Sequence, residues 1–308
     1  MTVLEEHLAG YLSMRRALGY KLARAEKLLD LFLAWLEDRG EETITTELAV
    51  RWATLPPATE SNWHAQRLSV VRGFAAHLHA LDPAHEVPAS DLLPQRPRRA
   101  VPYLYTDADV LALMNATSVI PTAHRAATMR TLIGLLAVTG MRIGEAIRLD
   151  LADIDQVRGL LRIRDTKFGK SRDLAVDQTT IRALREYLRR RDRPVPIEST
   201  AAVLTSAAGT RLLYCNVHLA FKRIVAHAGL RPCSSACRPR AHDLRHTFAV
   251  NTLLDAYRAG ADIPARLALL CTYLGHVNPG STYWYLQAAP ELLAVAAEHL
   301  ERFEDGAR

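Results

Sequence analysis

The stretch LLRIRDTKFGKSRDLAV, residues 160–176, decides the fold class of this chain of 308 residues. Apolar and basic residues alternate over 160–164 and the alternation returns over 172–176, which is typical of two short strands. The intervening KFGK, residues 167–170, is typical of the turn of a β-hairpin. The surrounding segments have helical spacing, so we predict a mainly α fold (α+β class) with one small antiparallel sheet.

The segments around this hairpin predict a mixed α/β domain over 106–308. Thr106 is suited to cap a first helix, because its hydroxyl can accept a hydrogen bond from a free backbone N–H. A largely apolar helix over 129–138 is closed by Gly140, a residue type that commonly ends helices. Apolar spacing predicts further helices over 181–191, 217–227, 243–257 and 291–303.

A separate helical domain is predicted for residues 1–93. Stripes of leucine and aromatic residues at helical spacing predict four helices there. These helices are expected near Leu4, over 28–36 with an end at Gly40, from Thr45 or Thr46, and from Ser61.

Three arginines of this helical domain are expected on or beside exposed helix faces. They are either solvated surface residues or contacts to phosphate, and the sequence leaves both readings open. The three residues are Arg51, Arg67 and Arg72.

An extended connector is predicted between the two domains, over 94–105. Prolines recur between residues 82 and 102 and break any helix, and Arg96, Arg98 and Arg99 lie among them. If the two domains grip opposite faces of a duplex, this basic arm would cross the phosphate backbone.

Composition and charge limit the class of protein only broadly. The hydrophobic fraction of 49% and the charged fraction of 23% are those of an ordinary globular protein. A net charge of +6 fits a polyanionic partner, although many basic proteins bind no nucleic acid. No apolar run approaches the roughly 20 residues that span a bilayer, and the start MTVLEEHLAG has no signal-peptide core. We expect a cytoplasmic protein that does not enter a membrane.

The four cysteines, Cys215, Cys233, Cys237 and Cys271, are expected to be reduced thiols. Cys233 and Cys237 lie close to His242, which is one way to begin a zinc site. A second pair of ligands with zinc-knuckle spacing is missing from this loop, so plain loop and core cysteines are the preferred interpretation. We therefore predict no metal and no cofactor.

Arg142 stands where a phosphate could bind. It follows the break at Gly140 and begins a helix predicted over 143–149, so its guanidinium would add to the positive end of that helix. The alternative is a structural ion pair with Glu145. Taken alone, the short stretch TGMRIGE favours the ion pair.

His242 and Arg245 are three residues apart, so on a helix they share one face. A second guanidinium beside that of Arg142 would stabilise the charge that develops on a pentacovalent phosphorane. His246 points elsewhere on the same helix and is expected to serve packing. An HxxR pair by itself is common.

Five segments, in this order, resemble the successive motifs of the tyrosine recombinase, or phage-integrase-like, family. They are TGMRIGE (139–145), TKFGKSR (166–172), HDLRHTF (242–248), LGH (274–276) and Tyr285. The match covers essentially residues 106–290. The helices expected over 1–93 agree in architecture with the family's core-binding domain, which clasps DNA.

This resemblance implies a complete active site of six residues. It implies that two arginines and a histidine hold the scissile phosphate, that a hairpin lysine protonates the departing 5′ oxygen, and that a second histidine assists the tyrosine nucleophile. The six catalytic residues are Arg142, Lys167, His242, Arg245, His276 and Tyr285.

Two of these assignments have rivals nearby. Lys170 lies three residues after Lys167, and the position within the hairpin motif favours Lys167. Tyr283 and Tyr285 would differ by about 200° around a helix, so both cannot face one phosphate. The family's spacing from His276 selects Tyr285.

The implied function is that of a site-specific DNA recombinase or integrase. Such an enzyme cleaves and rejoins strands through a 3′-phosphotyrosyl intermediate without a metal. The sequence of the tail, TYWYLQAAPELL, resembles that of integrases of transposable elements. The implied partners are double-stranded DNA, a homo-oligomer (normally a tetramer) and other recombinases, and the predicted helix over 291–303 would dock either on a neighbouring protomer or on its own core. The alternatives are relaxation of DNA by a type IB topoisomerase-like enzyme and a catalytically idle DNA-binding accessory protein.

Overall fold

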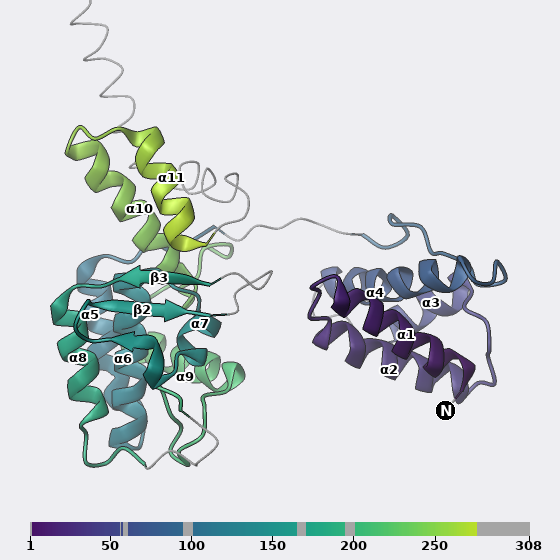
Figure 1. Ribbon diagram of the computed structural model, residues 1–308, viewed down its shortest axis with the longest axis horizontal. Coiled ribbons are helices and arrows are strands. Elements are labelled where there is room, and N and C mark those ends of the chain that lie inside the picture. The colour runs from purple at the N-terminus through teal and green to yellow at the C-terminus, as the bar shows by residue number, and fades with distance from the viewer. Residues whose placement is uncertain are drawn as a thin grey trace, which may run out of the picture. The chain divides into compact units, whose positions relative to one another are not determined.

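The computed structural model describes residues 2–55, 57, 61–94, 101–164, 171–194 and 201–275 (Figure 1). The chain divides into two compact units, residues 1–99 and 100–308. Part of the expected connector, residues 95–100, lies outside the described residues. The domain limits inferred from the sequence, 1–93, 94–105 and 106–308, and the DNA-binding role of the first domain stay predictions.

The first unit contains the four helices expected from its apolar stripes. Thr45 caps the third helix as expected, because its hydroxyl accepts a hydrogen bond from the backbone N–H of Leu48 at 3.2 Å. The second helix ends shortly before Gly40, whose positive φ of 67° suits a glycine. The helices are α1 (Val3–Ala17), α2 (Ala23–Glu37), α3 (Thr46–Thr54) and α4 (Ser61–His79). Their facing apolar side chains form one core, with Phe32, Leu36, Trp52, Val71 and Phe74 near its centre.

Arg67 was expected on or beside an exposed face, and this expectation was wrong. The residue is only 7% exposed, and Nη2 donates to the carbonyl oxygen of Trp52 at 2.8 Å. Its guanidinium carbon lies 3.6 Å from the centroid of the Trp52 ring, in a cation–π contact, and burial lowers the pKa of the guanidinium. Arg67 therefore belongs to the core of the first unit, whereas Arg51 is exposed and Arg72 is half-buried.

The second unit is built around one long helix. This helix, α6 (Ala123–Thr139), packs against α5 (Asp107–Ala116), α8 (Gln178–Leu188) and α10 (Asp243–Arg258). Thr106 caps α5 as expected, since its hydroxyl accepts from the N–H of Asp109 at 3.1 Å. The remaining helical elements are η1 (Thr117–Val119), α7 (Ile143–Arg148), η2 (Leu151–Asp153), α9 (Tyr214–His227) and α11 (Ile263–Leu274). The helix expected over 291–303 lies outside the described residues.

The hairpin strands predicted from the sequence are confirmed. Strands β1 (Ile154–Asp155), β2 (Leu160–Ile163) and β3 (Arg172–Ala175) form an antiparallel sheet in the order β1-β2-β3. Leu161 pairs with Leu174 and Ile163 pairs with Arg172. Directly paired residues point to the same face of a sheet, so Arg172 points to the face that Leu161, Ile163 and Leu174 bury. The turn at 167–170 lies outside the described residues.

Helices α10 and α11 form a small core of their own within the second unit. Val250, Leu253 and Leu270 are buried between them, and the rings of Phe248 and Tyr273 stack with centroids 5.6 Å apart. In Figure 1 the two helices lie next to each other at the end of this unit where β3 also lies. Within the described part of the chain, no helix has the length and apolar character to cross a membrane.

Candidate active site

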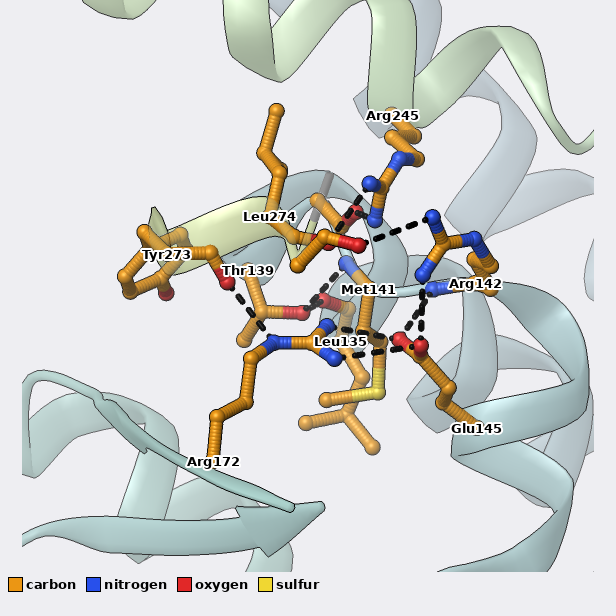
Figure 2. A network of polar contacts seen from close by, with 11 residues as sticks. Leu135, Thr139, Met141, Arg142, Glu145, Arg172, Arg245, Tyr273 and Leu274 are labelled. Atoms are coloured by element: carbon orange, nitrogen blue, oxygen red, sulfur yellow. Dashed lines mark hydrogen bonds and ion pairs between the residues drawn. The ribbon is translucent and has the colours of Figure 1, made fainter. Parts of the chain in front are cut away.

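Three of the six predicted catalytic residues are described by the structure, and they come together. Arg142, His242 and Arg245 lie where the ends of α6, α7, α10 and α11 meet. Figure 2 shows the two guanidiniums close to each other at the end of α11. Lys167, His276 and Tyr285 lie outside the described residues, so their places in the site stay predictions.

Gly140 makes the turn that brings Arg142 to this point. It caps α6 with φ of 58°, in the left-handed region that favours glycine. A Cβ atom here would lie 2.5 Å from Cδ1 of Phe248 and 3.1 Å from a methyl carbon of Leu274. The chain can therefore pass from α6 to α7 only because this position has no side chain.

Arg142 is tied to Glu145 by two hydrogen bonds. Its backbone N–H donates to Oε2 and its Nη1 to Oε1, both at 2.9 Å. The ion pair weighed as the alternative is therefore present, and the arginine side chain is still 36% exposed, so a role at a phosphate stays a prediction. The ion pair orients a guanidinium that a ligand can reach.

Arg172 completes the environment of Glu145, and sequence analysis gave it no role. Its Nη2 and Nη1 donate to the two carboxylate oxygens at 2.8 Å and 3.2 Å. Burial would raise the pKa of Glu145, but the hydrogen bonds from Arg172 and Arg142 outweigh it and lower the pKa to about 2. The signal was in the hairpin pattern, because Arg172 alternates onto the same face as Leu174.

The end of α11 accepts hydrogen bonds from three arginines (Figure 2). Arg172 Nε donates to the carbonyl of Tyr273 at 2.7 Å, and Arg245 Nη2 donates to that of Leu274 at 2.7 Å. Arg142 Nη2 lies 3.4 Å from the next carbonyl, that of Gly275. The last carbonyls of a helix have no partners within it and carry partial negative charge, so they attract cations. The C-terminus of α11 thus gathers guanidiniums from three distant sequence motifs.

Arg245 is the most enclosed of the three arginines, with 2% of its surface exposed. Besides its bond to Leu274, its Nη1 donates to the carbonyl of Gly140 at 2.8 Å. These two bonds join the ends of α6 and α11. A planar guanidinium can bridge two acceptors in this way, and an ammonium group does so less well.

His242 stands at the N-terminal cap position of α10, one turn before His246. The two imidazoles meet edge-on with ring centroids 4.9 Å apart, and His246 is buried, as expected for a packing residue. His242 itself is exposed, but its partial desolvation and the charges of Arg245, Arg142 and Arg240 lower its pKa to about 4. Near pH 7 the imidazole is therefore neutral.

The first turn of α10 is anchored by an ion pair whose carboxylate is buried. Asp243 has no exposed surface, and its two oxygens accept from Nη2 and Nε of Arg240 at 2.7 Å and 3.0 Å. Burial raises the pKa of Asp243, and the bonds from Arg240 oppose that rise. Tyr105 donates its hydroxyl to the carbonyl of Arg240 at 3.0 Å and its N–H to Thr247 at 3.0 Å. The segment before α5 therefore helps to fix His242 and Arg245.

The cysteines near His242 form no metal cluster in the described residues. Among these residues no group of three or more His, Cys, Asp or Glu side chains is placed to hold a metal ion. Cys233 is exposed, and the buried Cys237 donates its thiol to the carbonyl of Pro102 at 3.5 Å. Cys237 thus packs against the segment that precedes α5, near the start of the second unit.

The arrangement suits an anion that gains charge during a reaction. Three guanidiniums and one carboxylate leave two net positive charges around the end of α11, with His242 neutral beside them. A phosphodiester carries one negative charge and its pentacovalent transition state carries two. Fixed cations placed where charge develops are commonly the largest catalytic contribution.

Comparison with known proteins gives the family. Residues 104–291 match the model of the phage integrase family. The chain therefore belongs to this family of tyrosine recombinases and is a site-specific DNA recombinase. This confirms the family and the mainly helical architecture with a small antiparallel sheet that the sequence motifs indicated.

Relatives of the chain agree over almost its whole length. The putative integrase/recombinase y4rB of Sinorhizobium fredii (strain NBRC 101917 / NGR234) is 42% identical over 308 residues, which cover 98% of each chain. The fold resembles the Tn1549 transposon integrase in complex with transposon right end DNA, with a TM-score of 0.60, 20% identity, and coverage of 99% of this chain and 100% of that one. It also resembles a lambda integrase tetramer bound to a Holliday junction, with a TM-score of 0.58, 19% identity, and coverage of 92% and 76%.

Proposed function

We propose that the chain carries out strand exchange with Arg142, Lys167, His242, Arg245, His276 and Tyr285 as its catalytic residues. The Tyr285 hydroxyl attacks the scissile phosphate in line and forms a bond between its oxygen and phosphorus. The 5′ oxygen leaves with a proton from Lys167, which gives a 3′-phosphotyrosyl link and a free 5′ hydroxyl. The phenol proton passes to a base, for which His276 is the candidate. Attack by a 5′ hydroxyl of a partner strand reverses these steps and joins the two DNAs.

The observation that carries this proposal is the meeting of Arg142, Arg245 and His242 at the end of α11. Arg142 and Arg245 would bind the non-bridging oxygens, and neutral His242 would donate a further hydrogen bond. Lys167 precedes Arg172 by five residues, so even an extended chain keeps it within roughly 18 Å of that residue. His276 directly follows Gly275, whose carbonyl accepts from Arg142. The chain connection thus keeps Lys167 and His276 near the three described residues, and Tyr285 joins the site on the strength of the family's spacing from His276.

The substrate and partners follow from the same chemistry. We propose double-stranded DNA as the substrate, a tetramer as the active assembly, and other recombinases as partners that act on the same DNA. Support comes from the lambda integrase structure, which is a tetramer on a Holliday junction. The likeness to y4rB and to the Tn1549 transposon integrase supports integration or transposition of a mobile element as the biological role. Work on such DNA is consistent with a cytoplasmic location.

The test traps the covalent intermediate. Nicked duplexes are prepared from the DNA that flanks the gene of this chain, so that the strand beyond the nick is lost after cleavage and religation stops. We expect a covalent adduct whose digestion yields the peptide that contains Tyr285. Tyr285→Phe should bind the same duplex and form no adduct, while the matched control Tyr283→Phe should still form it. An adduct that survives Tyr285→Phe would overturn the assignment.

The same material separates the alternative functions. Relaxation of a supercoiled plasmid by a monomer, without recombinant products, would support the topoisomerase-like alternative. Binding without any adduct by the unchanged chain would support an idle accessory protein. Recombinant products from two site-bearing plasmids support the proposal.

A further inference from the structure

Arg172 connects three parts of the active site that are far apart in the sequence. It is the first residue of β3, it contacts Glu145 on α7, and it contacts Tyr273 at the end of α11 (Figure 2). We propose that Arg172 is a positioning residue of this site: it holds Glu145, and through Glu145 the guanidinium of Arg142, in register with the end of α11. This inference rests on the proposed role of Arg142 at the phosphate.

The carboxylate of Glu145 is shared symmetrically between the two arginines. Oε1 accepts from Nη1 of Arg142 at 2.9 Å and from Nη1 of Arg172 at 3.2 Å. Oε2 accepts from the backbone N–H of Arg142 at 2.9 Å and from Nη2 of Arg172 at 2.8 Å. Each oxygen has about two lone pairs, so these four bonds saturate the group. The four bonds hold the Glu145 carboxylate in one orientation, and this carboxylate in turn orients the guanidinium of Arg142.

Exposure assigns different tasks to the two arginines. The side chain of Arg142 is 36% exposed, that of Arg172 is 13% exposed, and Glu145 between them is 2% exposed. A ligand arriving from solvent therefore meets Arg142 first. Arg172 lies behind Glu145, and its three guanidinium nitrogens donate to Glu145 and to the carbonyl of Tyr273, so it acts on a phosphate through its neighbours.

The end of α11 is shaped to admit Arg172. Gly275 has φ of 68°, and a Cβ atom on it would lie 2.9 Å from Nη1 of Arg172. The glycine therefore ends the helix and also leaves room for the guanidinium of Arg172. Since Nε of Arg172 also binds the carbonyl of Tyr273, the arginine fixes the segment that leads directly to His276.

A lysine at position 172 would not reproduce these contacts. Its ammonium group is a point donor, whereas the observed geometry uses a planar fork toward the carboxylate and a third N–H toward a carbonyl. The conservative variant Arg172→Lys should therefore restore only part of what Arg172→Gln removes.

The decisive measurement is the pH profile of adduct formation, followed in single turnover on the nicked duplex with the full chain. For Arg172→Gln we expect a rate at neutral pH that is lower by about 10- to 100-fold, because a displacement of about 1 Å can cost this much, with DNA affinity within about threefold. We also expect the acid limb of the profile to move to higher pH, since Glu145 stays buried but loses one of the partners that keep it ionised. Adding Glu145→Gln to Arg172→Gln should return the acid limb to its position in the unchanged chain.

Other charged groups lie near Glu145 and could also shift the acid limb of the pH profile. On one side Glu145 shares a hollow with Arg148, Asp150, Asp153, Arg162, Arg164 and Arg211. On the side of α10 and α11 lie Arg142, Arg245, His242 and Tyr273. None of these is altered in the double variant, so an acid limb that stays at the higher pH in it belongs to one of them and overturns the proposal.

Arg158→Gln is the matched control. Arg158 lies between β1 and β2, is 78% exposed, has its Nε 4.0 Å from Asp155, and does not line the hollow that Glu145 shares. This variant should keep the rate and pH profile of the unchanged chain. A profile for Arg172→Gln that is parallel to that of the unchanged chain, or an unchanged rate, would overturn the positioning role.

Failure of the proposed function would be seen separately. If the unchanged chain forms no adduct on any duplex, the fault lies with the proposed function. A crystal structure of Arg172→Gln then tests the positioning alone. The guanidinium of Arg142 should leave its bond to Glu145 or shift relative to the carbonyl of Gly275, and an unmoved guanidinium would overturn the proposal.

Discussion

Nη2 of Arg245 lies 2.7 Å from the carbonyl oxygen of Leu274, and the arginine is almost completely buried there. The same side chain bridges to the carbonyl of Gly140, so it joins the ends of two helices. A residue of the proposed reaction centre is therefore also part of the fold. Changes at this position should affect both stability and catalysis, and a measurement must separate them.

Arg245→Lys is predicted to lose most of the chemistry while DNA binding remains. The ammonium group keeps the charge but cannot serve both carbonyls and a phosphate in fixed directions. Removing one preorganised donor from a charge-stabilising site costs about 10²- to 10³-fold in rate, and this is the expected loss in adduct formation. Single-turnover cleavage and equilibrium binding measured on the same duplex give the two effects separately. An adduct rate within twofold of the unchanged chain would contradict the role of Arg245.

Gly140→Ala is predicted to destabilise the second unit for two reasons. A non-glycine residue in the left-handed region costs about 1–2 kcal/mol. The added methyl group also meets the ring of Phe248 at 2.5 Å. Gly260→Ala is the matched control, because Gly260 has φ of 63° and open space around its Cβ position. Chemical denaturation followed by circular dichroism should show a larger loss for Gly140→Ala, and equal losses would rule out the steric contribution.

His242 is predicted to make the folded chain less stable in acid. Its folded-state pKa is about 4, below the ordinary value of 6.5. As the pH falls from about 6.5 to about 4, the unfolded chain takes up a proton at this residue and the folded chain does not, so the free energy of unfolding decreases. His242→Asn should reduce this dependence, which urea denaturation at a series of pH values measures. An unchanged dependence would show that other groups dominate.

A bound phosphate should act on His242 in the opposite direction. The anion would offset the three guanidiniums that lower the pKa, so binding of DNA should raise it and take up a proton. Calorimetric titration of DNA into the chain near pH 6, in buffers of different ionisation enthalpy, measures this uptake. His242→Asn should reduce it.

Lys167→Ala is predicted to be rescued by a better leaving group. Loss of a general acid typically costs 10²- to 10⁴-fold in rate. A 5′-thio leaving group needs no proton, because a thiol with a pKa near 8.5 leaves readily as a thiolate. On a duplex with sulfur at the 5′ bridging position, Lys167→Ala should cleave nearly as fast as the unchanged chain. Lys170→Ala should cleave the ordinary duplex normally, and the reverse pattern would transfer the role to Lys170.

Arg67→Ala is predicted to act on stability and not on DNA contacts. The residue loses a buried hydrogen bond and a cation–π contact with Trp52, together about 2–4 kcal/mol. Arg51→Ala, at an exposed position, should change stability by less than about 0.5 kcal/mol. Tryptophan fluorescence follows the unfolding well, since Trp35, Trp52 and Trp63 all lie in the first unit. Equal midpoints for the two variants would contradict the buried position of Arg67.

Sequence patterns predicted the parts of this fold that depend on local chemistry. The caps at Thr45 and Thr106, the end of α6 at Gly140 and the strands of the hairpin all follow from residues within a few positions of each other. The pair of Arg142 and Glu145 was also within reach, because the two residues lie three apart at a helix start.

The errors and omissions arose where the environment comes from distant segments. Arg67 lies four residues before Val71 and seven before Phe74, on the apolar stripe of α4. Its charge favoured an exposed position, and only the fold shows that the ring of Trp52 provides a buried partner. The contact between Arg172 and Tyr273 joins residues 101 positions apart, and no local pattern contains it. The alternation of β3 placed Arg172 on a buried face, and only the fold shows that Glu145 lies there.

The three carbonyls at the end of α11 make the length of that helix a constraint on the whole centre. Each residue added to an α-helix turns everything after it by about 100° and moves it by about 1.5 Å. A single insertion between Ile263 and Leu274 would therefore offer different carbonyls to Arg172, Arg245 and Arg142 at the same time. We expect variation in the length of this segment to be tolerated only outside the helix, in the turn before Asp262, which lies at the opposite end of α11 from these carbonyls.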